Sequence, residues 1–206
     1  MTFNGGRVIS PYPNDCENDC FMIDFTETLP TPQSDLRTKQ YFLIFCIMVA
    51  GKNAKSSTLK TWDLLQWAWE KTPFEYLESL IEKGKLESRL REIKTGMYDK
   101  LTKAIPQALK LYVETCSVED LEKIHGVGPK TSRFFLMHTR KGFEGAALDT
   151  HILKWMGRYV EVPKSTPSGK KYLQLEKKCL ELFKRHYPNQ AIAKIDFEIW
   201  KQYAKI

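Results

Sequence analysis

The chain reads Leu-Glu-Lys-Ile-His-Gly-Val-Gly-Pro-Lys from Leu121 to Lys130. This pattern is typical of a helix, a two-glycine hairpin and the first turn of a second helix. Gly126 and Gly128 permit the backbone angles of a tight turn and leave the amides around Val127 uncovered by side chains. Free amides at a helix N-terminus attract phosphate, because their N–H groups and the helix dipole point the same way. The stretch therefore predicts a backbone clamp on a phosphodiester chain, with an amine beside it.

A carboxylate follows this hairpin at a defined spacing. Asp149 comes nineteen residues after Lys130, within Leu148-Asp149-Thr150-His151, and an apolar helix over Ser132–His138 lies between them. A glycine hairpin alone also occurs in proteins that hold DNA without chemistry. Together and in this order, the segments resemble the helix-hairpin-helix/Gly-Pro-Asp superfamily of DNA glycosylases, to which endonuclease III and the 8-oxoguanine glycosylases belong. The resemblance is close over residues 118–158 and looser over the flanking helices.

The resemblance implies that Lys130 and Asp149 are catalytic. In that superfamily the slot of Lys130 is a lysine in the enzymes that also cut the strand. An amine that attacks C1′ forms an iminium ion with the opened sugar, which acidifies the C2′ proton and lets the 3′ phosphate leave by β-elimination. Asp149 would stabilise the sugar cation and assist deprotonation of the lysine. Its other predicted role is to cap the following helix.

The resemblance also implies contacts with DNA. His151 matches a position that contacts DNA in some relatives, although a histidine on a helix surface is an equally good reading. The loop Gly51–Lys55 aligns with one from which relatives push a side chain into the gap left by an extruded base. An ordinary polar turn is the alternative for that loop. The candidate residues for DNA contacts are the amides of Gly126, Val127, Gly128 and Lys130 on phosphates, His151, Asn53 as the wedge, and Lys52 or Lys55 on the backbone.

The cysteines predict no metal cluster. Cys16 and Cys20 lie near each other, but no second pair completes a four-ligand site. Some relatives carry a C-terminal four-cysteine iron–sulfur cluster, whereas Cys179 alone follows the catalytic region here. We therefore expect no iron–sulfur cluster and no required cofactor. The resemblance does imply a structural potassium or sodium ion, held by the backbone carbonyls of Glu122, Ile124 and Val127.

Charge is concentrated in the half of the chain that contains the hairpin. The net charge is +7, and residues 117–206 supply all of it, with 17 Lys/Arg against 10 Asp/Glu. A surface that follows phosphates needs this bias, although a lysine-rich solvated face is the alternative.

No apolar run approaches the roughly 20 residues of a membrane span, and the N-terminus has no signal-peptide pattern. We expect a monomer that works inside the cell, with the DNA and away from membranes.

The sequence predicts an all-α protein with two helical lobes, a cleft between them and the hairpin in one lobe. Residues 1–33 are rich in Pro, Gly and Asn, which predicts an irregular segment whose apolar piece Phe21–Phe25 packs on the body. Residues 34–206 form the glycosylase region, with lobes of about 34–116 plus the C-terminal helices and of about 117–160. We expect helices over Ser34–Ala50, around Trp62–Trp69, from Pro73 after a Thr72–Glu75 capping box, and over Leu86–Ile93, Tyr98–Leu111, Val118–Ile124, Thr150–Tyr159, Gly169–His186 and Gln190–Tyr203.

These patterns predict a bifunctional DNA glycosylase and AP lyase. Its partner would be double-stranded DNA containing a damaged base or an abasic site, and it would remove an oxidised base through a Schiff base on Lys130. The C-terminal segment Lys194–Trp200 faintly resembles compact archaeal-type 8-oxoguanine glycosylases, which places 8-oxoguanine slightly ahead of oxidised pyrimidines. Two alternatives stay open: an endonuclease III-like glycosylase for oxidised pyrimidines, and a non-catalytic helix-hairpin-helix DNA-binding module. The histidines and acids show no metal-ligand spacing, which argues against a metal hydrolase.

Overall fold

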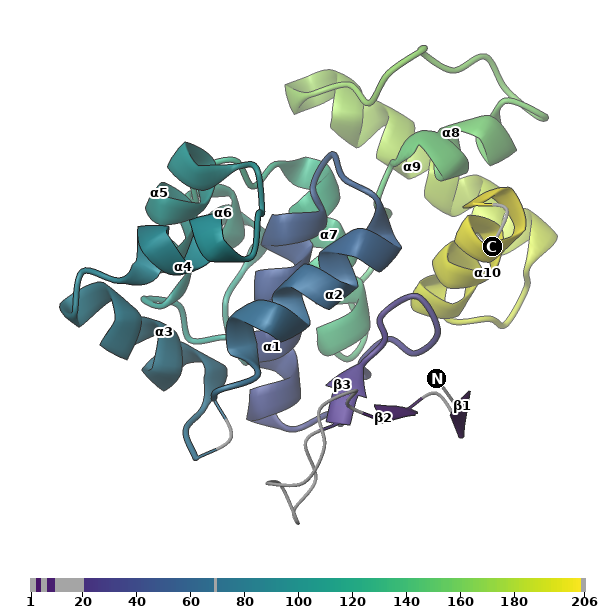
Figure 1. Ribbon diagram of the computed structural model, residues 1–206. Coiled ribbons are helices and arrows are strands. Elements are labelled where there is room, and N and C mark those ends of the chain that lie inside the picture. Colours follow the sequence, from purple (N-terminus) through teal and green to yellow (C-terminus); the bar gives the residue numbers. More distant parts are fainter. Residues whose placement is uncertain (1–2, 5–6, 10–20, 69, 205–206) are drawn as a thin grey trace.

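The computed structural model describes residues 3–4, 7–9, 21–68 and 70–204. Most of them lie in helices, which confirms the all-α prediction, and Figure 1 shows a larger and a smaller group of helices. The larger group holds α1 (Leu36–Val49), α2 (Ala54–Leu65), α3 (Pro73–Glu82), α4 (Leu86–Glu92), α5 (Tyr98–Ala108), α6 (Val118–Glu122) and α7 (Pro129–Thr139). The smaller group holds α8 (Thr150–Met156), α9 (Gly169–His186) and α10 (Ile192–Ala204). Over the described ranges, none of the helices has the length and apolar character needed to cross a bilayer.

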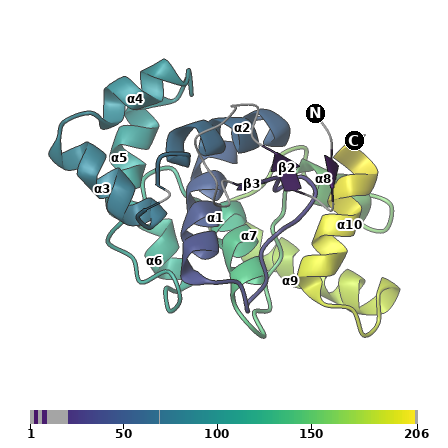
Figure 2. The same ribbon diagram turned by 60° about the horizontal axis from the view of Figure 1, so that its bottom comes forward.

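Helix α1 is the central element of the larger group (Figure 2). Every residue from Lys39 to Met48 is buried, because this stretch is apolar on nearly all sides and can pack in any direction. It contacts α2, α3, α5 and α7. Asp35 caps the helix by accepting a hydrogen bond from the Thr38 amide at 2.6 Å. The predicted start of this helix, Ser34, therefore lies one residue before the cap.

Other helix boundaries also differ from the prediction. Helix α2 begins at Ala54, because the Asn53 side chain caps it by accepting a hydrogen bond from the Ser56 amide at 3.0 Å. The helix predicted around Trp62–Trp69 therefore starts earlier and ends at Leu65, while Trp69 itself lies outside the described residues. The capping box of α3 is confirmed, with both reciprocal hydrogen bonds formed. Helices α5, α6 and α8 end two or three residues before the predicted limits.

Two hydrophobic cores divide the chain differently from the predicted lobes. The first core runs from Phe25 to Leu136 and joins α1–α7, and the second runs from Ala146 to Ile199 and joins α8–α10. The hairpin helices α6 and α7 thus belong with the first lobe, and α8 belongs with the C-terminal helices. The reason is packing: Phe135 on α7 is fully buried against α1, whereas Trp155 on α8 packs on rings of the second core. The boundary falls near residue 145, not at 117 and 160.

The N-terminal segment contains a small sheet that the sequence did not reveal. Strands β1 (Phe3–Asn4), β2 (Arg7–Ile9) and β3 (Phe21–Ile23) pair antiparallel in that order, with Val8 opposite both Phe3 and Met22. The prediction of an irregular segment is therefore wrong for these residues. The predicted packing of the apolar piece is confirmed, since Phe25 is only 3% exposed. Its ring contacts those of Tyr41, Phe42 and Phe45 on α1.

A buried histidine makes the first core sensitive to acid. His138 on α7 is 4% exposed between the rings of Phe42 and Phe134, and its Nε2 has no hydrogen-bond partner in the described part of the chain. Burial lowers the pKa of His138 to about 4, because the charged ring would lose its hydration. The histidine stays neutral in the folded state but takes up a proton in the unfolded state below about pH 6.5. Stability is therefore lost as the pH falls from 6.5 towards 4.

We expect the free energy of unfolding to fall by about 3 kcal/mol more between pH 7 and pH 4 in the wild-type protein than in His138→Leu. Leucine keeps an apolar contact with the neighbouring rings and removes the titrating group. Urea denaturation of both proteins at the two pH values measures this difference, because the other titrating groups are common to both. Equal losses in the two proteins would contradict the burial effect.

Candidate active site

The hairpin has the predicted turn between α6 and α7. Gly126 has φ of +74°, a conformation that favours glycine. Gly128 is the N-cap of α7, and Pro129 occupies the first position of that helix. The Val127 amide donates to the Ile124 carbonyl at 3.0 Å, so it is not free for phosphate as the sequence suggested. Among the described residues, the amides of Gly126, Gly128 and Lys130 donate no hydrogen bond, so these three can form the clamp.

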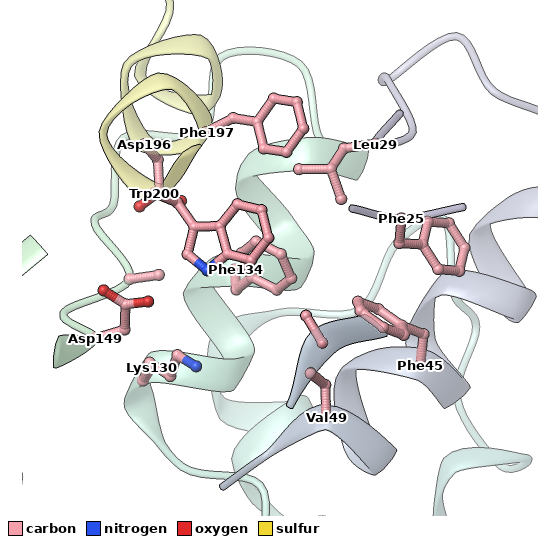
Figure 3. A pocket seen from close by; sticks show the side chains of 12 residues that line it. Phe25, Leu29, Phe45, Val49, Lys130, Phe134, Asp149, Asp196, Phe197 and Trp200 are labelled. Atoms are coloured by element: carbon pink, nitrogen blue, oxygen red, sulfur yellow. The ribbon is translucent and has the colours of Figure 1, made fainter. Parts of the chain in front are cut away.

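Lys130 and Asp149 line the same recess, which is partly enclosed and opens to solvent. Helices α1, α7 and α10 contribute to its walls, together with the segment after β3. In Figure 3 the polar side chains Lys130, Asp149 and Asp196 gather on one side of this recess. The opposite side is apolar, so a flat ring could lie there with its polar substituent towards the three ionisable groups. The larger apolar side chains of the recess are Phe25, Leu29, Phe45, Val49, Phe134, Phe197 and Trp200.

Asp149 is fixed by its position ahead of α8. It is the N-cap of that helix, as predicted, and its Oδ1 accepts hydrogen bonds from the amides of His151 and Ile152, each at 2.8 Å. Both bonds fall on one oxygen, and Oδ2 has no partner among the described residues. The cap therefore holds the carboxylate rigidly while leaving one of its oxygens available to the recess.

A buried network connects the segment that carries Asp149 to α7 and α9. Glu176 on α9 accepts hydrogen bonds from the Ala146 amide at 3.0 Å and from Arg133 Nε at 3.2 Å. The Tyr172 hydroxyl donates to the Ala146 carbonyl at 2.7 Å and accepts from the Leu148 amide at 3.2 Å. Arg133 lies one turn after Lys130 on α7 and also pairs with the side chain of Glu122 on α6. The network thus connects α7, which carries Lys130, to the segment that carries Asp149.

We expect Tyr172→Phe to lower the free energy of unfolding by about 2 kcal/mol, because two buried backbone groups lose their partner. The segment that ends in Asp149 would loosen, and the rate of the chemical step should fall about tenfold. Urea denaturation and single-turnover kinetics measure the two effects. Tyr112→Phe is the matched control, since Tyr112 is 85% exposed. Wild-type stability and rate in Tyr172→Phe would show that the hydroxyl does not support the site.

Two known proteins are similar to this chain, one in sequence and one in structure. No protein-family model matches the chain. The 8-oxoguanine DNA glycosylase/AP lyase of Thermoplasma volcanium is 36% identical over 80 residues, which are 39% of this chain and 37% of that protein. A crystal structure of the Methanocaldococcus jannaschii 8-oxoguanine glycosylase/lyase, in complex with a 15mer DNA containing 8-oxoguanine, superimposes with a TM-score of 0.61. It is 22% identical, over 84% of each chain.

The chain has the fold of that glycosylase/lyase. Both proteins are 8-oxoguanine glycosylase/lyases, which agrees with the resemblance to DNA glycosylases that the hairpin and Asp149 carry. The sequence match spans little more than a third of the Thermoplasma enzyme, so activity and substrate have to be argued from the residues of this chain.

The other predicted DNA contacts lie around the recess of this glycosylase-like fold. His151 is half-buried, and its ring meets the edge of Trp200 with 6.4 Å between ring centroids. Lys52, Asn53 and Lys55 are exposed, and the intervening residue Ala54 lines the recess. The wedge loop therefore borders the recess, although Asn53 already serves as the cap of α2. Contacts of these four residues with DNA stay predictions.

The predicted cation ligands lie at the hairpin, and their chemistry suits a monovalent ion. Backbone carbonyls are the oxygen ligands that potassium prefers. The Ile124 carbonyl already accepts the Val127 amide, and it keeps a second lone pair for an ion. Glu122 is the last residue of α6 and Val127 follows the hairpin turn, so their carbonyls belong to the two ends of that turn. Among the described residues, no three side chains of His, Cys, Asp or Glu form a group that could hold a metal ion, and Cys179 is buried in the second core.

Sequence reasoning missed two contributions to the recess. Asp196 on α10 is 5% exposed and lines the recess beside Lys130 and Asp149. The sequence pattern that could have revealed Asp196 is an acid between Ile195 and Ile199, both of which lie on the buried side of an amphipathic helix. Phe25 and Leu29 come from a segment without helical periodicity, so their place in the recess follows only from the tertiary fold.

Proposed function

We propose that this protein is a base-excision repair DNA glycosylase with AP lyase activity, and that it removes 8-oxoguanine from double-stranded DNA. The observation that carries the proposal is that Lys130 and Asp149 line one recess. Lys130 lies in the first turn of α7, beside the hairpin and its three free amides. A monomer suffices for this reaction, because one chain supplies every group named. An enzyme of this kind works inside the cell, where the DNA is.

The hairpin and the basic half of the chain would hold the DNA backbone. The free amides of Gly126, Gly128 and Lys130 would donate hydrogen bonds to phosphate, and a cation on the hairpin carbonyls would add to the attraction. Clamping the backbone beside the lesion keeps the sugar at the mouth of the recess. The extruded base then enters between aromatic side chains, where stacking contributes about 1–3 kcal/mol per base.

Lys130 would attack C1′ of the extruded nucleotide while the base departs. The sugar becomes positively charged as the glycosidic bond breaks, and the Asp149 carboxylate stabilises that charge. The resulting iminium ion acidifies the C2′ proton, and β-elimination expels the 3′ phosphate. The nearby thiol of Cys46 does not compete for the sugar, because it is fully buried and burial raises its pKa well above the usual range.

Release of bases from single-lesion duplexes tests the proposal. We expect the wild-type protein to release 8-oxoguanine and leave a β-elimination product, with no release from an undamaged duplex. Preferential release of thymine glycol would assign the site to oxidised pyrimidines instead. Salt-sensitive binding without any base release or strand cleavage would show a DNA-binding module and contradict the proposal.

A further inference from the structure

Asp196 is a third ionisable residue in the recess, and neither capping nor the buried network explains it. It lies on α10, which packs against α8 and α7. The side chain is 5% exposed, and its Oδ1 is buried without a hydrogen-bond partner in the described part of the chain. Burying a polar atom without a hydrogen-bond partner costs free energy, because its hydration is lost and nothing replaces it. A buried acid without a partner in the free protein indicates a partner that enters the recess.

The surroundings of Asp196 favour its protonated form. Burial raises the pKa of Asp196 well above its usual range, the Asp149 carboxylate raises it further, and Lys130 opposes both effects. Two carboxyl groups that face one recess titrate as a coupled pair, and a charge on both at once is disfavoured. Asp149 is half-buried, and its Oδ1 accepts hydrogen bonds from two amides. Asp196 is therefore the acid of the recess that is disposed to supply a proton.

The chemistry proposed for the recess needs an acid in addition to a nucleophile. When the glycosidic bond breaks, its electron pair goes to the base nitrogen, and the base leaves more easily if a proton arrives at the same time. Figure 3 shows Asp196 on α10, across the recess from the apolar wall and on the same side as Asp149 and Lys130. A base that rests on the aromatic side chains would present its polar edge to Asp196.

We propose that Asp196 is the general acid that protonates the departing base, a role that rests on the proposed function of the recess. The neutral amine of Lys130 forms a bond to C1′, and the bond between C1′ and the base nitrogen breaks. The base takes the proton of Asp196 and leaves as a neutral molecule. The new C1′–N bond leaves an extra proton on the lysine nitrogen, and the Asp196 carboxylate accepts it. The acid is thereby regenerated, and no outside reactant is consumed.

The role separates the two activities of the enzyme. Base release needs the acid because a base departs. Strand cleavage at a preformed abasic site has no departing base, so it depends on Lys130 and Asp149 but far less on Asp196. Asparagine in place of Asp196 keeps a hydrogen-bond donor and an acceptor of nearly the same shape, yet it cannot transfer a proton. Loss of proton transfer can therefore be distinguished from loss of base recognition.

The experiment compares single-turnover rates on a duplex containing 8-oxoguanine and on one containing a preformed abasic site. For Asp196→Asn we expect the ratio of base release to strand cleavage to fall about 100-fold or more. Asp196→Ser should give the same change in ratio, which guards against a folding defect peculiar to one variant. Glu198→Gln is the matched control, since Glu198 is on the same helix and pairs with Lys194 at the surface, and its ratio should equal that of the wild type.

Affinity for the lesion completes the test. Measured in Lys130→Gln, which cannot react, binding of the 8-oxoguanine duplex should change less than threefold when Asp196→Asn is added. An unchanged ratio of rates, or an affinity loss as large as the loss in base release, would overturn the role as an acid. A wild-type protein that releases no base would overturn both this role and the proposed function. An active wild type with an unchanged ratio in the variant overturns this role alone.

Discussion

Lys130→Gln should abolish strand cleavage and lower the rate of base release by about four orders of magnitude or more. The variant has no amine that can bond to C1′, so neither the covalent intermediate nor the β-elimination that follows from it can form. Glutamine is a good helix former, and Lys130 lies in the first turn of α7, so the fold should be retained. Single-turnover rates on lesion duplexes, with circular dichroism as a check of folding, measure the effect.

Lys123→Gln is the matched control for the loss of charge. Lys123 is the C-cap of α6 on the other side of the hairpin and pairs with Asp120 at the surface. Its removal should weaken DNA binding slightly and leave the chemical step unchanged. If Lys130→Gln kept strand cleavage at a preformed abasic site, another amine would have to be the nucleophile.

Asp149→Asn should lower the rate of the chemical step by about two to three orders of magnitude with little change in stability. Asparagine caps helices as well as aspartate does, so the bonds from the amides of His151 and Ile152 are retained. The negative charge that stabilises the sugar cation is lost, and this is the change that affects the rate. Asp149→Ala should lose the cap as well and unfold about 1 kcal/mol more easily.

Asp35→Asn serves as the control for the cap itself. Asp35 caps α1 with the same kind of hydrogen bond and lies outside the recess. The two aspartate-to-asparagine variants should have similar free energies of unfolding, and only Asp149→Asn should lose activity. A rate for Asp149→Asn close to that of the wild type would restrict Asp149 to its structural role.

The candidate pair, Lys130 and Asp149, could be predicted from the sequence because its signals are local. Two glycines that stand four and two residues before a lysine, and an aspartate that caps the next helix, each follow from short-range rules of turns and caps. The structure places the two residues in one recess, as the order of the motifs implied. The Val127 amide was wrongly predicted to be free. Its hydrogen bond to the Ile124 carbonyl depends on the detailed geometry of the turn, which the sequence does not give.

The remaining parts of the recess depend on contacts between distant segments. Phe25 reaches it through its packing on α1, and Asp196 through the packing of α10 on α8 and α7. The lobe boundary was misplaced for the same reason. Whether the hairpin helices join the first core or the second is decided by which apolar faces meet, and a single sequence gives no measure of that.

The central claim is that Lys130 forms a covalent bond to the sugar, and borohydride trapping tests it most directly. The wild-type protein, mixed with duplex that contains 8-oxoguanine and with sodium borohydride, should yield a reduced protein–DNA adduct. After proteolysis, mass spectrometry should locate the modification on Lys130 and on no other amine. An active protein that forms no adduct, or an adduct carried by a different lysine, would contradict the account.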